Sequence, residues 1–87
     1  MYKIKFTNTA IKSLKKIDKT DQKRILDQIE ELGVDPLQKS NVKKLTNSPH
    51  LRLRVGNYRV IFDKDDYIKV IAVIDILHRK NAYRRNY

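Results

Sequence analysis

Residues 51–62 constrain the fold most, because apolar and mostly basic side chains alternate there on both sides of a Gly56-Asn57 dipeptide. Alternation over five or more residues is typical of a half-buried β-strand, and Gly-Asn is a signal for a two-residue hairpin turn. The segment therefore predicts a β-hairpin of fixed register. Its expected pairs are Val55 with Tyr58, Arg54 with Arg59, Leu53 with Val60 and Arg52 with Ile61.

This register separates the side chains of the hairpin into an apolar face and a basic face, because directly opposed residues point the same way. The apolar face is expected to carry Leu51, Leu53, Val55, Tyr58, Val60 and Phe62. The other face is expected to carry Arg52, Arg54 and Arg59, together with Ile61. Clustered arginines are costly unless an anion neutralises them. That anion is either a carboxylate of the fold (Asp63, Asp66 or Asp75) or an external phosphate, which arginine binds in a bidentate manner.

The rest of the chain predicts an α+β fold of order β-α-α-β-β-β, with a basic tail that favours a short helix. Residues 2–6 alternate as a strand, and residues 10–32 contain two apolar stripes at helical spacing. Gly33 is expected to end the second helix in a left-handed conformation. Residues 43–45 fit either a helical turn or a strand. Residues 67–76 are nearly all apolar and predict a strand buried on both faces. We expect the helical hairpin to pack on a mainly antiparallel twisted sheet.

Length and composition exclude several classes of protein. The chain has 87 residues, which allow one domain over residues 1–87. It has no cysteine, hence no disulfide, thiolate zinc site or cysteine nucleophile. Two histidines speak against a His-rich metal site, and we expect no cofactor and no metal. No apolar run approaches the ~18 residues of a membrane span, and no signal segment is recognisable, so we expect a cytoplasmic protein.

The net charge of +10 is unevenly distributed along the chain. Residues 36–62 carry six basic and no acidic side chains, and residues 76–87 carry four basic and none acidic. Two basic blocks favour contact with a polyanion, most often nucleic acid or the ribosome. The alternative is a solvated basic surface that only aids solubility.

Two segments of the sequence together resemble the RelE branch of the RelE/ParE toxins. Residues 45–62 contain the pattern Leu-Arg-x-Arg-x-Gly-x-Tyr-Arg, and residues 76–84 read Ile-Leu-His-Arg-Lys-Asn-Ala-Tyr-Arg. Length and element order agree over nearly the whole chain. The resemblance implies a microbial-ribonuclease-like fold and the toxin of a type II toxin–antitoxin pair. It further implies an mRNA interferase that cleaves messenger RNA in the ribosomal A site without a metal, using the substrate 2′-hydroxyl as nucleophile.

The resemblance also implies roles for individual residues. It places Arg52 and Arg54 at the phosphate, Arg59 at the transition state and Arg79 at the leaving group. Tyr83 falls on a tyrosine that stacks on or orients a base. The further RNA contacts expected from the basic segments are Lys43, Lys44, Lys80 and Arg84. His78 is a candidate acid or base because its intrinsic pKa is near 6.5, or else a strand-end histidine with a local hydrogen bond.

Partners follow from the same resemblance. They are a small, partly disordered antitoxin similar to RelB, the messenger RNA and the 30S A site with its 16S rRNA, and no membrane. The general base is not identified, because arginine stays protonated. Two other functions remain open. One is a ParE-like inhibitor of DNA gyrase on the same fold, and the other is a degenerate basic module that binds nucleic acid or antitoxin without catalysis.

Overall fold

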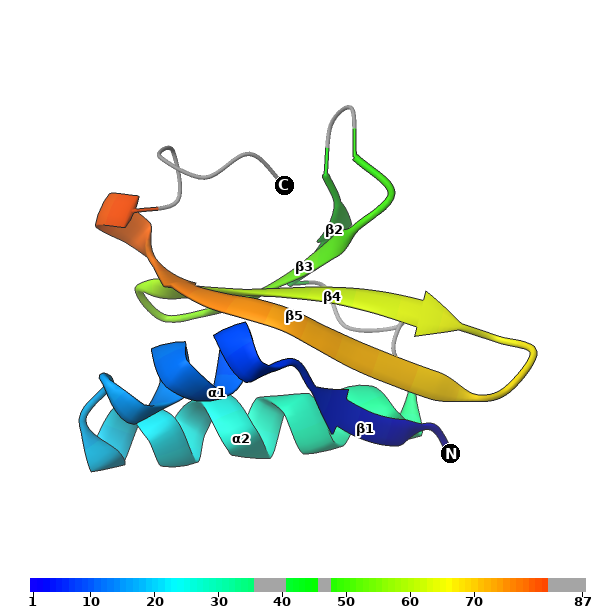
Figure 1. The fold of residues 1–87 in the computed structure, drawn as a ribbon, viewed down its shortest axis with the longest axis horizontal. Helices are drawn as coiled ribbons and strands as arrows, with labels where there is room; N and C mark the ends of the chain where they lie inside the picture. The colour runs from blue at the N-terminus through cyan, green and yellow to red at the C-terminus, as the bar shows by residue number, and fades with distance from the viewer. Residues whose placement is uncertain (36–40, 46–47, 82–87) are drawn as a thin grey trace.

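The computed structural model describes residues 1–35, 41–45 and 48–81. Within them the chain forms five strands, two helices and one 3₁₀ turn (Figure 1). In chain order these are β1 (Lys3–Phe6), α1 (Asn8–Lys15), α2 (Lys19–Val34), β2 (Val42–Lys44), β3 (Leu51–Val55), β4 (Tyr58–Asp65), β5 (Val70–His78) and η1 (Arg79–Asn81). None of the helices in these ranges is long and apolar enough to cross a membrane.

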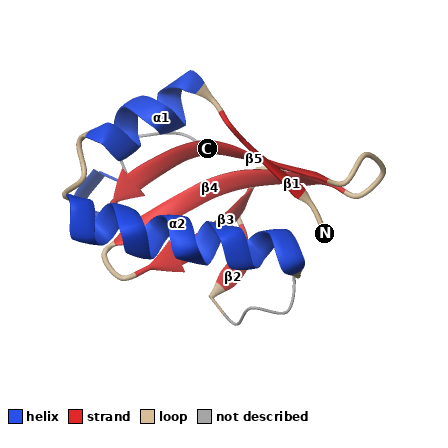
Figure 2. Cartoon of the chain, turned by 90° about the horizontal axis from the view of Figure 1, so that it is seen from below, coloured by secondary structure: helices blue, strands red, loops and turns tan. Residues whose placement is uncertain are grey.

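The five strands form one sheet in the order β1-β5-β4-β3-β2, and both helices cover the same face of it (Figure 2). Only the β1–β5 pair is parallel; the other three pairs are antiparallel. The predicted α+β architecture is therefore confirmed. The open question about residues 43–45 is also answered, since Lys43 and Lys44 belong to the edge strand β2, which pairs with β3.

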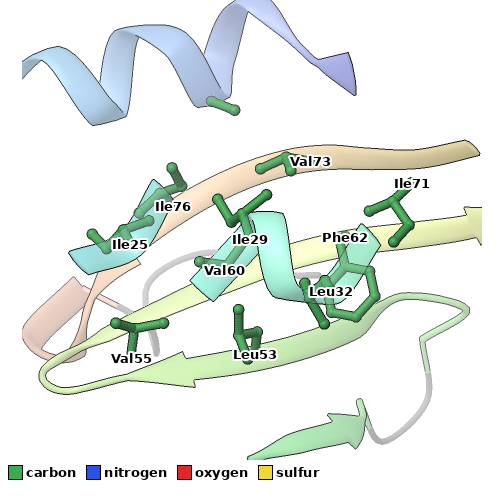
Figure 3. Packing of buried hydrophobic residues seen from close by; sticks show 11 residues of the cluster. Ile25, Ile29, Leu32, Leu53, Val55, Val60, Phe62, Ile71, Val73 and Ile76 are labelled. Carbon is green, nitrogen blue, oxygen red and sulfur yellow. The ribbon is translucent and has the colours of Figure 1, made fainter. Parts of the chain in front are cut away.

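The core lies between α2 and the helix-covered face of the sheet (Figure 3). Ile25, Ile29 and Leu32 recur on one side of α2 at helical spacing and are at most 1% exposed. The sheet supplies the opposing layer, with Leu53, Val55, Val60, Phe62, Ile71, Val73 and Ile76. The predicted apolar face of the hairpin is thus the inner wall of the core, and Leu51 and Tyr58 pack against its border.

The β3–β4 hairpin has the predicted register, pair by pair from Arg52↔Ile61 to Val55↔Tyr58. Gly56 has a φ of +56°, whereas Asn57 does not have a positive φ. Positive φ at the first central residue alone is the pattern of a type II′ turn, which matches the twist of the flanking strands. The arginines therefore lie on the face opposite the helices, as expected.

The prediction that Gly33 ends α2 in a left-handed conformation is wrong. Gly33 is instead a buried residue within the helix. Its carbonyl accepts a 2.7 Å hydrogen bond from the main-chain nitrogen of Tyr2. A Cβ at this position would lie only 3.2 Å from the carbonyl oxygen of Tyr2. Glycine is needed here because the start of the chain crosses close to α2.

The buried strand predicted over residues 67–76 is displaced toward the C-terminus, since β5 begins at Val70. Tyr67 and Ile68 are 97% and 63% exposed in the β4–β5 turn. The Asp65 carboxylate accepts hydrogen bonds from the main-chain nitrogens of both residues, and Lys69 has a φ of +57°. These hydrogen bonds from the main chain to Asp65 extend the β4–β5 turn to Lys69. The pattern of apolar residues along the sequence does not show such a side-chain contact.

A β-bulge near the middle of β5 brings α1 and the sheet together. Ile61 opposes Asp75 whereas Phe62 opposes Val73, which leaves Ile74 as the extra residue. Asp75 is fully buried and accepts hydrogen bonds from the Ser13 hydroxyl (2.6 Å) and the main-chain nitrogen of Ile76 (2.7 Å). A bulge redirects the strand beyond it. The last residues of β5 therefore run to the β3–β4 turn.

The N-terminus is joined to the β4–β5 turn by a cluster around Tyr2. The Tyr2 hydroxyl donates a 2.6 Å hydrogen bond to Asp66, and Lys64 donates a 2.9 Å bond to the same carboxylate. Lys69 lies 5.1 Å from the centre of the Tyr2 ring. The hydrogen bond from Tyr2, reinforced by the one from Lys64, lowers the pKa of Asp66, and the same Tyr2–Asp66 bond raises the pKa of Tyr2.

We expect Tyr2→Phe to weaken the acid sensitivity of folding. A carboxylate whose folded pKa is lowered stabilises the protein above its unfolded pKa, and this contribution is lost as the pH falls through the folded value. Urea midpoints of wild type and Tyr2→Phe should therefore differ fully from about pH 5 up to neutral pH and converge as the pH falls through the lowered pKa of Asp66. The raised tyrosine pKa predicts a second loss, in the wild type alone, as the pH rises above 10. Parallel pH profiles for the two proteins would contradict the role of this cluster.

Candidate active site

The β3–β4 turn, the start of β4 and the start of η1 surround a pocket of about 150 Å³. Its lining residues are Arg54, Gly56, Asn57, Tyr58, Arg59 and Arg79. We call it the three-arginine pocket. Arg54 and Arg59 face each other across the ladder, and the main-chain nitrogen of Arg79 donates a 2.6 Å hydrogen bond to the carbonyl of Asn57. That bond ties η1 to the turn, so three arginines from separate positions in the sequence meet.

The three-arginine pocket is strongly cationic. Within the described residues, no carboxylate forms an ion pair with Arg54, Arg79 or the neighbouring Arg52. Of the three carboxylates considered as internal counterions, Asp63 bonds His50 at 2.5 Å and Asp66 bonds Tyr2 and Lys64. Asp75 accepts from Ser13, and both Asp75 and Arg59 have further contacts within the fold. Guanidinium groups gathered in this way favour a bidentate oxyanion such as phosphate.

Tyr58 lines the three-arginine pocket, while its side chain packs at the border of the core on the helix-covered face of the hairpin. Burial raises the pKa of this phenol, and the nearby Asp21 and Asp18 carboxylates raise it further. The group therefore stays protonated at neutral pH and acts as a hydrogen-bond donor. The sequence pattern assigned Tyr58 to packing; the structure places it in both the core border and the pocket.

His78 lies beside the three-arginine pocket rather than in its lining. Its ring meets that of Tyr58 edge-on, with ring centres 5.1 Å apart. Its Nδ1 accepts a 3.1 Å hydrogen bond from the main-chain nitrogen of Lys80. In the neutral ring this contact leaves the proton on Nε2, so His78 presents a donor. An adjoining pocket is lined by Asn57, His78, Arg79 and Lys80, and it shares Asn57 and Arg79 with the first.

The other predicted RNA contacts are divided between the two faces. Lys43 opposes Arg52, which opposes Ile61, so both cations share the open face with Arg54 and Arg59. Lys44 opposes Leu51 and therefore belongs to the helix side of the sheet. Lys80 is exposed in η1. Tyr83 and Arg84 lie outside the described residues.

The described part of the chain holds no group of three or more His, Asp or Glu side chains that could bind a metal ion.

Comparison with known protein families identifies the chain. The family described as "ParE toxin of type II toxin-antitoxin system, parDE" matches residues 4–83. The chain belongs to this toxin family. Among curated proteins, none matches the sequence.

The toxin is similar in fold and sequence to RelE proteins of known structure. It is 31% identical to a chain of the RelB–RelE antitoxin–toxin complex from Methanococcus jannaschii, covering 92% of this chain and 95% of that one with a TM-score of 0.76. The archaeal RelE–RelB complex from Pyrococcus horikoshii gives 28% identity, coverage of 93% and 98%, and a TM-score of 0.80. The isolated Escherichia coli RelE toxin, at 19% identity with coverage of 90% and 84%, shares the fold with a TM-score of 0.75. The resemblance to the RelE branch of the RelE/ParE superfamily is confirmed.

Sequence reasoning missed three pocket-lining residues of this toxin: Gly56, Asn57 and Tyr58. The first two were interpreted only as a turn. The signal that could have found them is their position, because a turn between two arginine-bearing strands necessarily borders any site that those arginines form.

Proposed function

We propose that this toxin is a ribosome-dependent endoribonuclease, which cleaves messenger RNA in the ribosomal A site and thereby arrests translation. The observation that carries the proposal is the three-arginine pocket. It gathers Arg54, Arg59 and Arg79 around a space of about 150 Å³, which suits one phosphate group. The RelE fold supports the same function, because the closely similar structures are RelE toxins and their complexes.

The proposed reaction begins with attack of the substrate 2′-hydroxyl oxygen on the adjacent phosphorus. The P–O bond to the 5′-oxygen of the next nucleotide breaks, which leaves a 2′,3′-cyclic phosphate and a free 5′-hydroxyl. Negative charge builds on the phosphoryl oxygens in the pentacoordinate transition state. Arg54 and Arg59 bind those oxygens from the two strands, and fixed cations of this kind are often the largest catalytic contribution. Arg79, on η1, stabilises the charge on the departing 5′-oxygen.

The proton transfers require groups other than the arginines, which stay protonated. His78 presents a donor in its neutral form and adjoins Arg79 in the neighbouring pocket. We assign it to protonation of the 5′-oxygen, for which the ring first takes up a second proton and then returns to the neutral form, because a neutral imidazole is too weak an acid to give up its proton. Removal of the 2′-hydroxyl proton falls to the ribosome or the substrate, since Tyr58 is itself protonated at neutral pH.

The proposal includes two further partners. The first is an antitoxin similar to RelB, because the structures with 25–31% identity are complexes of RelE with RelB. The second is the 16S rRNA around the 30S A site, for which the exposed cations Lys43 and Lys80 supply sequence-independent contacts. Tyr83 is assigned to base stacking and Arg84 to backbone contact.

Inhibition of DNA gyrase is a second candidate function. The family description favours it, because it names ParE toxins. On this alternative the open arginine face would serve for binding and no RNA would be cut.

A reconstituted translation reaction distinguishes the two functions. We expect a defined messenger to acquire new 5′ ends, mapped by primer extension, only when both ribosomes and toxin are present. A parallel supercoiling reaction with purified gyrase should remain uninhibited. Absence of cleavage together with loss of supercoiling would replace the ribonuclease by the gyrase inhibitor.

A further inference from the structure

A second pocket, about 310 Å³ in volume, lies between α2 and the end of β3. Arg24, Asp27 and Gln28 of α2 line it together with Asn41, Arg54 and Gly56. Arg54 and Gly56 also line the three-arginine pocket, so the two spaces adjoin at the end of β3 and the β3–β4 turn. We call the second space the α2 pocket.

The sheet side of the α2 pocket is held in place by Asn41. Its side-chain nitrogen donates a 2.7 Å hydrogen bond to the carbonyl of Arg54, and the main-chain nitrogen of Arg54 donates a 3.0 Å bond to the carbonyl of Asn41. These two bonds continue the β2–β3 ladder by one position. The amide nitrogen of Asn41 is engaged in this way, and the other polar atom of the side chain, its amide oxygen, can only accept hydrogen bonds.

The helix side presents a cation, a carboxylate and an amide on one face, since residues three and four apart are neighbours on a helix. Arg24 packs against the β3–β4 turn: a Cβ on Gly56 would lie 3.3 Å from its Nη2 atom. Its ion pair with Asp21 is long, at 3.7 Å, and solvent-exposed. Asp27 is exposed and has no ion-pair partner among the described residues, in a protein whose net charge is +10.

The two pockets differ in volume, which suggests that they hold different parts of a nucleotide. The α2 pocket reaches the lower end of the ~300–1,000 Å³ typical of small-molecule sites. The three-arginine pocket is half as large and holds three cations. Because the two pockets share Arg54 and Gly56, a nucleotide whose phosphate occupies the smaller pocket can place its own or a neighbouring base in the larger one.

We propose that the α2 pocket is a base-binding subsite of the toxin, and that Asp27 makes it select guanine. This inference rests on the proposed function, because it assumes that RNA phosphate occupies the three-arginine pocket. An ionised carboxylate only accepts hydrogen bonds. Guanine presents two adjacent donors, N1–H and N2–H, on its Watson–Crick edge. Adenine and cytosine place a ring acceptor beside a single amino group, and uracil has one N–H between two carbonyls, so a carboxylate matches neither pattern.

The remaining groups of the pocket complete this selection. Gln28 supplies both a donor and an acceptor, and the donor matches the O6 oxygen of guanine. Arg24 can stack its planar guanidinium on the base. Asp27 thus provides the discrimination, whereas the cation provides affinity for any base.

A nuclear magnetic resonance titration of the ¹⁵N-labelled toxin with guanosine or adenosine monophosphate tests the subsite without ribosomes. We expect the guanine nucleotide to bind at least about fivefold more tightly, as one good bidentate base contact allows. It should shift the amide resonances of Arg24, Asp27, Gln28 and Asn41. Asp27→Asn should bind the two nucleotides about equally. Glu30→Gln changes the same charge at an exposed position of α2 that lines neither pocket, and it should keep the preference.

Several outcomes would overturn the subsite. These are equal affinity of the wild type for the two nucleotides, binding of neither, or shifts restricted to Arg54, Arg59 and Arg79, which would indicate phosphate binding alone. Loss of the preference in Glu30→Gln as well would also overturn it. Guanine selectivity that depends on Asp27, in a toxin that fails to cut ribosome-bound messenger, would instead support the subsite and refute the ribonuclease.

Discussion

Arg79→Ala is expected to reduce ribosome-dependent cleavage by about 10²–10³-fold, the usual cost of losing one fixed group that stabilises transition-state charge. The substitution removes the η1 guanidinium from the three-arginine pocket. It leaves the 2.6 Å bond from the main-chain nitrogen to Asn57 in place, because that bond needs no side chain. We expect an equal loss for Arg59→Ala, which removes the cation opposite Arg54. The measurement is the rate of messenger cleavage in the reconstituted translation reaction.

Lys12→Ala is the matched control, since it removes one exposed positive charge from α1, away from the open face. It should cut messenger at nearly the wild-type rate. The thermal midpoint of Arg79→Ala should stay close to wild type, because the side chain is exposed. A variant of Arg79 or Arg59 that is folded and retains more than about a tenth of the activity would show that the arginine is not part of the catalytic machinery.

Phe62→Ala is expected to destabilise the fold by about 3–5 kcal/mol, the largest effect of any single truncation in this core. Phe62 is fully buried in the cluster with Leu32 and Ile71 (Figure 3). It is also the residue at which the β4–β5 register shifts. Because about 1 kcal/mol changes the melting temperature of a small domain by roughly 4–8 °C, the midpoint should fall by at least about 12 °C.

Tyr67→Ala provides the comparison for Phe62→Ala. It truncates another aromatic side chain, one that is 97% exposed in the β4–β5 turn. We expect its thermal midpoint to match that of the wild type, as is usual for surface substitutions away from special features. Similar midpoints for the two variants would mean that Phe62 does not anchor the core.

The hairpin could be predicted from the sequence because its determinants are local. Residues 52–61 alternate on both sides of a Gly-Asn turn, and these features alone fix register and faces. The open-face location of Arg54 and Arg59 follows directly. The approach of Arg79 to them was expected only by resemblance, since it depends on the β5 bulge and on the bond to Asn57.

The incorrect predictions concern one contact between distant segments and one local side-chain contact in a turn. Gly33 is helical because Tyr2 lies against it, and nothing within residues 25–36 encodes that approach. Tyr67 and Ile68 match a buried strand in composition, but Asp65 draws their amides into the turn. The α2 pocket likewise joins residues of α2 to Asn41 and Arg54, so its members do not form a motif.

The strand order β1-β5-β4-β3-β2 has a consequence for biosynthesis. Within the described residues, the only sheet neighbour of β1 is β5, the last of the five strands, which follows it by more than sixty residues. A polypeptide emerging from the ribosome from its N-terminus therefore cannot engage β1 until β5 has been translated, and Arg79 comes directly after β5. A toxin built in this order acquires its cationic centre only after translation of its own messenger has passed the codon for Arg79.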